Sequence, residues 1–244
     1  MQRNTFNMKK TIPKYRVKLI DLGVCDFKEA WDFQISIFDE IISWKKSVDA
    51  LSEAKQPPGA LIFVEHPHIF TLGKSGSESN MLIDDIQLKA KGASFYRIDR
   101  GGDITYHGPG QIVCYPIFNL DALNIGLKEY IYRLEKTIIN VVEKYGLKAS
   151  RLEGGTGVWL DYDVNGKARK ICAIGVKASR FVTMHGLAFN VNTNLEYFNF
   201  INPCGFVDKG VTSLENELGE KQDLDTAKRI VCEEMKEVFN LEIF

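Results

Sequence analysis

Residues 170–191 have the sequence KICAIGVKASRFVTMHGLAFNV, in which two apolar runs are separated by a short polar segment. Apolar runs of this length with so short a connection are typical of a β-hairpin. A second hairpin precedes it, because Asn165-Gly166 separates residues 158–160 from the run that begins at Lys170. Asn-Gly is the dipeptide that two-residue hairpin turns favour. This half of the chain is therefore predicted to be rich in antiparallel strand pairs.

Helices interrupt the predicted strands at several places. Residues 26–46, which Asp26 can cap, place apolar side chains at helical spacing, and residues 126–145 and 223–239 carry similar stripes. In the first helix these positions are Phe27, Trp31, Ile35, Phe38 and Ile42. Further strands are predicted at 15–22, 60–65, 69–73, 94–98 and 111–118, with a short helix at 84–91. We therefore predict an α/β chain of the α+β type, with mixed, largely antiparallel sheets and flanking helices.

The organisation of the chain indicates one domain. Residues 15–244 contain no repeat, low-complexity tract or linker, and residues 1–14 are polar and basic. We therefore expect a disordered leader over 1–14, followed by a single domain over 15–244. The leader has no apolar core like that of a signal peptide, and the apolar runs elsewhere are only as long as strands. These features predict a cytoplasmic protein that does not span a membrane.

The composition excludes some classes of function. The chain has 244 residues, of which 45% are hydrophobic and 26% charged, and its formal net charge is −1. A chain so close to neutral has no general positive field to hold nucleic acid or an anionic membrane surface. We therefore expect neither as a partner.

The cysteines do not form a metal-binding or disulfide pattern. Their number is odd and no Cys-x-x-Cys pair occurs, so neither a disulfide framework nor a zinc site is predicted. His66 and His68 have the spacing of a metal-binding pair, but no third ligand lies nearby in the sequence. We expect no metal and five free thiols, at Cys25, Cys114, Cys172, Cys204 and Cys232.

A glycine-rich stretch, RGGDITYHGPGQ over residues 100–111, lies between two predicted strands. Gly101-Gly102 allows backbone angles that other residues avoid and lets another backbone or a ligand approach closely. Loops of this kind often hold binding sites, although many only turn the chain. From its composition alone, the stretch is equally consistent with a binding loop and with a simple turn.

Cys204 and Lys170 are candidates for nucleophilic chemistry. Cys204 lies in the turn Asn202-Pro-Cys-Gly205, where backbone N–H groups could bind an oxyanion. An ammonium group nearby favours a thiolate, and Lys170 opens an apolar strand from which it can point into a cleft. A turn cysteine without a role and a solvated lysine are the alternatives. Cys172 is a rival nucleophile, because a period of two residues places it on the same strand face as Lys170.

Five blocks of the sequence resemble the lipoate-biosynthesis octanoyltransferases, the lipoyl(octanoyl) transferases. The first two are Glu65-His-Pro with Thr71-Leu-Gly73, and the glycine-rich stretch 100–111. The others are Lys170-Ile-Cys-Ala-Ile-Gly175, His185-Gly-Leu-Ala-Phe-Asn-Val191 and Ile201-Asn-Pro-Cys-Gly205. They occur in the order of the family and extend over about residues 60–215.

The resemblance implies a fold like the catalytic domain of biotin and lipoate protein ligases. It implies transfer of an octanoyl group from octanoyl-acyl carrier protein to a lysine of lipoyl domains, in the acyltransferase subunits of 2-oxoacid dehydrogenases and in the glycine-cleavage H protein. At the matching positions of this chain, the resemblance implies that Cys204 forms the acyl thioester and that Lys170 lowers the pKa of the Cys204 thiol. The residues implied to line the acyl site are Arg100, Gly101, Gly102, Asp103, Ile104, Thr105, Tyr106, His107, Ala173, Ile174, Gly175, Gly186, Leu187 and Ala188.

The implied chemistry needs no cofactor, and a monomer is expected. Exchange between two thioesters is nearly thermoneutral, so no ATP is required for the first step. The acceptor amine must lose a proton before it attacks, and a desolvated Lys170 can accept that proton. His107 and His185 either assist or only order the loop by hydrogen bonds. Because acyl carrier proteins are acidic, positive side chains among Lys74, Arg100, Lys177 and Arg180 are expected near the entrance.

Two other functions are weighed against this one. An ATP-dependent lipoate or biotin protein ligase on the same fold would need no cysteine, but the chain lacks the Gly-Arg-Gly-Arg type of loop of those ligases. A non-catalytic module that binds lipoyl domains would also tolerate the loss of Cys204.

Overall fold

The computed structural model describes residues 14–47, 56–164, 166–202 and 209–244. The predicted leader, apart from its last residue, and the proposed nucleophile Cys204 lie outside the described residues. No helix in the described ranges is both long enough and apolar enough to cross a membrane.

A large mixed sheet forms the centre of the described chain. Its strand order is β12-β1-β2-β6-β10-β9-β8-β7, and β11 pairs with β9 beside this path. β1 runs parallel to β2 and β12, and β11 runs parallel to β9, whereas the other neighbours are antiparallel. The prediction of mixed, largely antiparallel sheets is therefore confirmed. The bounds of the strands are β1 Tyr15–Val24, β2 Gly59–Glu65, β6 Gln111–Ile117, β7 Ala149–Leu152, β8 Gly155–Leu160, β9 Arg169–Ser179, β10 Val182–Asn190, β11 Gly210–Val211 and β12 Leu241–Ile243.

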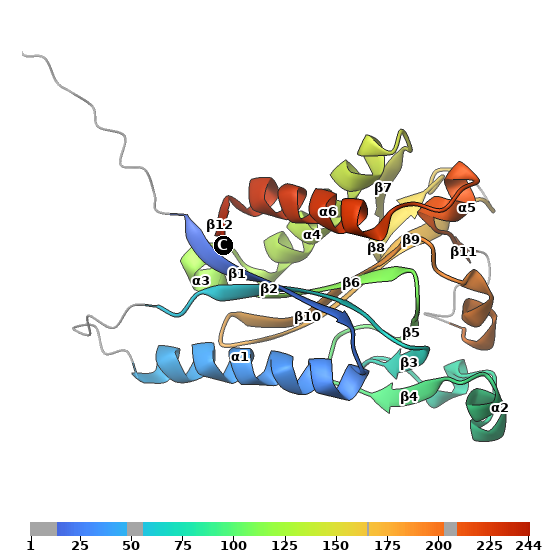
Figure 1. Cartoon of the computed structure of the whole chain (residues 1–244), viewed down its shortest axis with the longest axis horizontal. Helices are drawn as coiled ribbons and strands as arrows, with labels where there is room; N and C mark the ends of the chain where they lie inside the picture. The colour runs from blue at the N-terminus through green and yellow to red at the C-terminus, as the bar shows by residue number, and fades with distance from the viewer. Residues whose placement is uncertain (1–13, 48–55, 165, 203–208) are drawn as a thin grey trace, which may run out of the picture.

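A smaller sheet of order β4-β3-β5 lies near the N-terminal end of α1 (Figure 1). Its strands are β3 Ile69–Leu72, β4 Ser94–Arg97 and β5 Ile104–His107. β5 falls inside the glycine-rich stretch that we expected to be one loop, and it pairs with β3 from Leu72↔Ile104 to Ile69↔His107. The expectation was wrong at this point because glycines at both ends of the run supply the turns. The β-branched and aromatic residues between them are free to form a strand.

Helices cover both faces of the large sheet. Figure 1 shows α1 Phe27–Ser47 on one face, and α4 Leu127–Lys144 with α6 Leu224–Phe239 on the other. The core follows this division, because Ala30, Phe38, Ile41 and Ile42 of α1 belong to a different apolar cluster from the apolar residues that α4 and α6 bury. In the predicted stripe of α1, Trp31 and Ile35 are only half-buried. Three short helices complete the part of the fold that is described, namely α2 Asp85–Ala90, α3 Leu120–Leu123 and α5 Leu214–Leu218, with 3-10 turns at Glu78–Asn80 (η1) and Leu195–Phe200 (η2).

Polar caps fix the helix starts that the sequence predicts. The Asp223 carboxylate accepts a hydrogen bond from the Thr226 backbone N–H at the start of α6. At α2, Asp84 and Gln87 form a reciprocal capping box through their side chains and backbone N–H groups. Each such pair satisfies N–H groups that the first helical turn leaves unpaired.

Both predicted hairpins are present. β8 pairs with β9, and β9 pairs with β10 through a register that runs from Phe189↔Cys172 to Val182↔Ser179. The turn between β9 and β10 consists of Arg180 and Phe181, whose φ angles are +49° and +61°. Two successive positive φ angles give the turn a twist that suits the strands on either side.

Candidate active site

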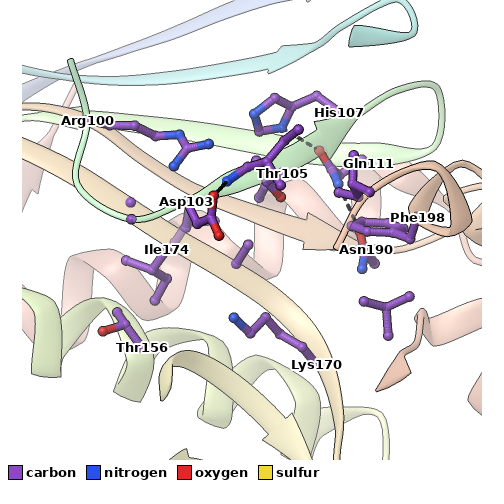
Figure 2. A pocket seen from close by; sticks show the side chains of 18 of the residues that line it. Arg100, Asp103, Thr105, His107, Gln111, Thr156, Lys170, Ile174, Asn190 and Phe198 are labelled. Carbon is purple, nitrogen blue, oxygen red and sulfur yellow. Dashed lines mark hydrogen bonds between the residues drawn. The ribbon is translucent and has the colours of Figure 1, made fainter. Parts of the chain in front are cut away.

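A cavity of about 720 Å³ lies between the two sheets. β6, β9 and β10 of the large sheet line one side, and β5 with the residues before it lines the other. Figure 2 shows Arg100, Asp103, Thr105 and His107 across the cavity from Lys170. The close approach of two sheets places residues that are far apart in sequence around one space.

Small residues make the centre of the cavity wall on the large sheet. Ala173 pairs with Ala188 across β9 and β10, and Gly175 pairs with Gly186, and all four line the cavity. A Cβ atom at Gly186 would overlap the carbonyl oxygen of Cys114 on β6. Gly186 is therefore required by the packing of β10 against β6. Because the Ala173–Ala188 and Gly175–Gly186 pairs have small side chains or none, they leave space for the cavity over this part of the sheet.

Arg100 and Gly101 attach the glycine-rich turn to the two sheets. Arg100 is only 7% exposed, and its Nη2 donates to the carbonyl oxygen of Thr71 at 2.7 Å and to Thr71 Oγ1 at 2.9 Å. The backbone N–H of Gly101 donates to the carbonyl oxygen of Val176 on β9 at 2.9 Å. A Cβ at Gly175 would lie 3.0 Å from Arg100 Cδ, so a glycine there lets the arginine pass. The turn is thereby attached to β3 and β9 together.

A directed chain of hydrogen bonds runs along the cavity from this arginine. Thr71 Oγ1 lies 3.4 Å from His107 Nε2, and His107 Nδ1 lies 2.8 Å from Gln111 Oε1. Gln111 Nε2 donates to Asn190 Oδ1, and Asn190 Nδ2 donates to the carbonyl oxygen of Thr212, each at 2.9 Å. Because an amide oxygen only accepts, Nδ1 carries the proton of His107 and Nε2 accepts from Thr71. Every donor in the chain therefore points the same way, and Figure 2 shows the part of the chain from His107 through Gln111 to Asn190.

His107 is neutral in this arrangement. Burial is the main cause that lowers its pKa, to about 3, and a second contribution comes from His66 nearby. Both ring nitrogens are engaged within the wall. Of the two interpretations of His107, the geometry favours the one in which the ring orders the loop.

We predict that His107 makes the stability of the protein depend on pH with a definite sign. Its pKa is about 3 in the fold, whereas an unfolded histidine titrates near about 6.5. Between these values only the unfolded chain takes up the proton, so the stability is complete above about pH 6.5 and is lost as the pH falls. The free energy of unfolding should drop by roughly 1.4 kcal/mol per pH unit in this window through His107 alone.

Urea unfolding of wild type and His107→Gln, at several values between about pH 7.5 and pH 5, measures this slope. His66 and His185 also have lowered pKa values, so the variant should keep part of the dependence. Equal slopes in the two proteins would contradict the prediction.

His185 lines the cavity and is tied to the base of the glycine-rich turn. Its ring is 2% exposed, and Nε2 lies 2.9 Å from Asp99 Oδ1, while Lys177 Nζ contacts Asp99 Oδ2 at 2.5 Å. The hydrogen bond to His185 is the first cause that holds the pKa of Asp99 well below its usual range. Burial lowers the pKa of His185 despite that carboxylate. Both lowered pKa values are consistent with a neutral His185 that donates a hydrogen bond from Nε2 to an ionised Asp99.

Lys170 reaches the cavity from β9. Figure 2 shows its side chain extending from the strand into the space that Asn190, Thr156 and Ile174 also line. Its Nζ lies 4.6 Å from the centre of the Trp159 ring. The backbone carbonyl of Lys170 accepts from the Thr212 N–H at 2.9 Å, so the end of the hydrogen-bonded chain adjoins this lysine.

Cys172 does not share the cavity with Lys170, contrary to the simple alternation of strand faces. Val158 pairs with Cys172 and the next residue, Trp159, pairs with Lys170, so Ile171 is an extra residue in a β-bulge. Ile171 and Cys172 are both 0% exposed and belong to the core that faces α4 and α6. Burial raises the pKa of the Cys172 thiol well above its usual range.

Cys204 lies outside the described residues, but its described neighbours in sequence line the cavity. Ile201 and Asn202 precede it, and Lys209 and Gly210 follow it. Of the residues that the resemblance implies, the cavity wall includes Arg100, Gly102, Asp103, Ile104, Thr105, His107, Ala173, Ile174, Gly175, Gly186, Leu187, Ala188 and Lys170.

Tyr106 and Gly101 do not line the cavity. Tyr106, a residue of β5, is fully buried, and its hydroxyl lies 2.7 Å from His68 Nδ1 while its ring stacks on Tyr197. Gly101 contributes the backbone hydrogen bond to β9 described above. The stack of Tyr106, Tyr197 and His68 attaches η2 to the small sheet, and η2 supplies Phe198 and Asn199 to the wall.

The histidines at 66 and 68 have structural partners. His66 Nδ1 and Nε2 lie 2.8 Å from the Cys25 carbonyl oxygen and the Tyr115 hydroxyl, respectively. His68 belongs to the aromatic stack. In the described ranges, no group of three His, Cys, Asp or Glu side chains is arranged to hold a metal ion.

Two of the positive side chains expected near the entrance bond to other residues of the protein, Arg100 in a buried position and Lys177 in a half-buried one. Arg100 is bonded to Thr71, and Lys177 is paired with Asp99. Lys74 and Arg180 are exposed. The residues at the cavity that sequence reasoning did not identify include Gln111, Trp159, Asn190 and Phe198. Gln111 ends the glycine-rich stretch and Asn190 lies in the block from His185 to Val191, but Trp159 and Phe198 carry no signal that distinguishes them from core or loop residues.

The sequence matches a family model over most of its length. Residues 29–236 match the lipoyl protein ligase A/B catalytic domain. The chain belongs to this family.

Named relatives place the chain among the octanoyltransferases of the family. An octanoyltransferase of Parabacteroides distasonis is 54% identical over 219 residues, which cover 90% of this chain and 96% of that protein. An octanoyltransferase of Bacteroides fragilis is 53% identical and covers 88% of this chain and 94% of its own length. These relatives make the chain an acyltransferase and favour octanoyl transfer over the ligase alternative.

Solved structures confirm the ligase-like fold. A putative lipoate protein ligase of Thermoplasma acidophilum with bound lipoic acid has a TM-score of 0.65 at 15% identity, and the match covers 95% of this chain and 88% of that one. LipL1 of P. falciparum in complex with lipoate has a TM-score of 0.68 at 12% identity, with 93% and 65% covered. At these identities the likeness concerns the fold alone.

Proposed function

We propose that this octanoyltransferase takes the acyl group from octanoyl-acyl carrier protein and passes it to a lysine of lipoyl domains through a thioester on Cys204. The observation that carries the proposal is the position of Lys170. Its side chain enters a cavity whose wall includes small residues and the described residues on both sides of Cys204. A cation beside a thiol in such a site favours the thiolate.

The first step exchanges one thioester for another. The Cys204 thiolate attacks the thioester carbonyl, and the phosphopantetheine thiolate leaves as the new thioester forms on Cys204. The Lys170 ammonium can give its proton to the departing thiolate, which leaves Lys170 as a neutral amine. Cys172 is poorly suited to this step, because it is buried in the core and its thiol pKa is raised.

The second step forms an amide. The amine of the target lysine attacks the thioester carbonyl, and a C–N bond replaces the C–S bond. Neutral Lys170 can accept the proton that the amine loses, which restores the ammonium for the next cycle. The Cys204 thiolate leaves as the amide forms.

The proposed acceptors are lipoyl domains of the acyltransferase subunits of 2-oxoacid dehydrogenases and of the glycine-cleavage H protein. A structure of similar fold supports this class of acceptor, because it describes a Thermoplasma acidophilum lipoate protein ligase together with its E2 lipoyl domain. We propose that a monomer is sufficient for this chemistry, since described residues of one chain line the cavity from both sheets.

We predict that incubation with octanoyl-acyl carrier protein without ATP adds one octanoyl group to the protein, as seen by intact-protein mass spectrometry. Cys204→Ala should lose the adduct and at least about 10³-fold of the transfer rate, because no covalent intermediate can form. Cys172→Ala is the matched control and should keep both. An adduct that survives in Cys204→Ala but not in Cys172→Ala would move the nucleophile, and no adduct in any protein would overturn the thioester mechanism.

A further inference from the structure

We propose that Trp159 is a positioning residue of the transfer reaction, whose indole face holds the ammonium of Lys170 in place and in its charged form. The inference rests on the proposed role of Lys170. The resemblance to the family assigned no role to Trp159, which lies in a predicted hairpin strand.

The two side chains are direct neighbours across paired strands. Trp159 on β8 is paired with Lys170 on β9, and the Lys170 Nζ lies 4.6 Å from the ring centre. An ammonium within about 6 Å of an aromatic centre is attracted by the negative face of the ring, and tryptophan is the strongest such partner.

The indole is fixed in its position. It is 2% exposed, and its Nε1 donates to the carbonyl oxygen of Gly155 at 2.8 Å. A Cβ at Gly155 would lie 3.4 Å from Cζ2 of the ring, so the backbone closes over one edge of the indole. A ring held by packing and by its N–H cannot follow a lysine that moves, so it defines where the ammonium rests.

The strand beside the indole also makes room for the stem of the lysine. Gly157 has a φ of +123°, and a Cβ there would lie 2.5 Å from the Cys172 carbonyl oxygen and 3.5 Å from Cδ and Cε of Lys170. Its N–H donates to Glu135 Oε1 at 3.1 Å, which keeps this backbone in place. The bulge at Ile171 turns Lys170 towards this side, so the local backbone is shaped around the lysine.

An aromatic ring stabilises an ammonium in a different way from a carboxylate. A carboxylate beside Lys170 would favour the ammonium, but its negative charge would oppose a thiolate forming in the same cavity. The indole favours the ammonium without adding a charge. Among the described residues, the other charged side chains that line the cavity are Arg100, Asp103 and Lys209. Glu135, behind Gly157, is paired with Arg151 at 2.9 Å.

The alternative is that Trp159 only fills space, and two substitutions separate the interpretations. Trp159→Phe keeps an aromatic face and loses the Nε1 hydrogen bond. Trp159→Leu loses the same bond and has no aromatic face. Both shorten the side chain, so a purely structural role predicts similar losses in the two variants. Trp159→Met replaces the leucine variant if the latter does not fold.

The experiment measures the rate of alkylation of Cys204 by iodoacetamide as a function of pH in the full chain, with the peptide carrying the label identified by mass spectrometry. Single-turnover formation of the octanoyl-enzyme is followed in the same proteins. In Trp159→Leu, we expect the acyl-enzyme to form about 3- to 30-fold more slowly and the alkylation profile to move to higher pH, because less ammonium faces the thiol. Trp159→Phe should stay within about threefold of wild type, and the KM for the donor should not change.

Equal behaviour of Trp159→Leu and Trp159→Phe in both measurements would overturn the inference. Lys170→Met keeps this failure distinct from a failure of the proposed function. If Lys170→Met leaves the alkylation profile at its wild-type position, then the proposed pairing of Lys170 with Cys204 is wrong. If Lys170→Met moves the profile and Trp159→Leu does not, then only the role of Trp159 is wrong.

Discussion

Lys170→Met is expected to lower the rate of octanoyl transfer by about 10²- to 10⁴-fold, because the proposed cycle loses both its cation and its proton carrier. The fold should remain intact, since the Lys170 side chain enters a cavity and not the core. Steady-state kinetics with octanoyl-acyl carrier protein and a lipoyl domain measure the loss. Lys128→Met, which changes an exposed lysine of α4, is the matched control and should behave as wild type.

Lys170→Arg separates the two roles that the lysine is given. A guanidinium keeps the positive charge but does not give up its proton near neutral pH. We therefore expect this variant to form the acyl-enzyme faster than Lys170→Met, yet to pass the acyl group on as slowly. A transfer rate of Lys170→Met within about tenfold of wild type would show that neither role is essential.

Arg100→Met is expected to lower the free energy of unfolding by about 2 to 4 kcal/mol. Methionine has a similar length but donates no hydrogen bond, so the carbonyl oxygens of Thr71 and Gly101 lose a buried donor. The cost of a buried acceptor left unpaired is about 1 to 3 kcal/mol. Urea unfolding measures the change.

Arg229→Met is the matched control for this prediction, because Arg229 is an exposed arginine on α6 that forms an ion pair with Glu233, four residues further on. Its loss should change the stability by less than about 0.5 kcal/mol. Arg100→Lys should recover only part of the stability, since one ammonium cannot reproduce the fork that reaches both carbonyl groups. If Arg100→Met and Arg229→Met lowered the free energy of unfolding equally, the stabilising role given to the Arg100 hydrogen bonds would be wrong.

The elements with a strong local signal could be predicted from the sequence. The β8–β9 hairpin, the helices that begin next to Asp84 and Asp223 and the apolar stripes of the long helices all depend on neighbours in the chain. The pairing of β5 with β3 could not be found in this way. It depends on a glycine turn that the Arg100 side chain attaches to β3 and that the Gly101 backbone N–H attaches to β9 of the large sheet.

The candidate site shows the same limit. The sequence blocks correctly assigned Lys170 and the glycine-rich stretch to one site. Alternation along β9 wrongly predicted that Cys172 shares a strand face with Lys170, because one extra residue, Ile171, interrupts the alternation. A bulge is a matter of register between two strands, and no single strand records it. Trp159 was missed for a related reason, since its contact with Lys170 exists only across the pair.

The directed hydrogen bonds from Thr71 through His107 and Gln111 to Asn190 have a consequence for the energetics of turnover. Each group in this wall has its donor and acceptor already assigned, so none can rotate without breaking a buried bond. In water, dipoles must reorient each time charge moves onto a carbonyl oxygen, and that reorganisation is part of the barrier. Here the orientation is set once, when the chain folds, and it does not have to be found again in each catalytic cycle.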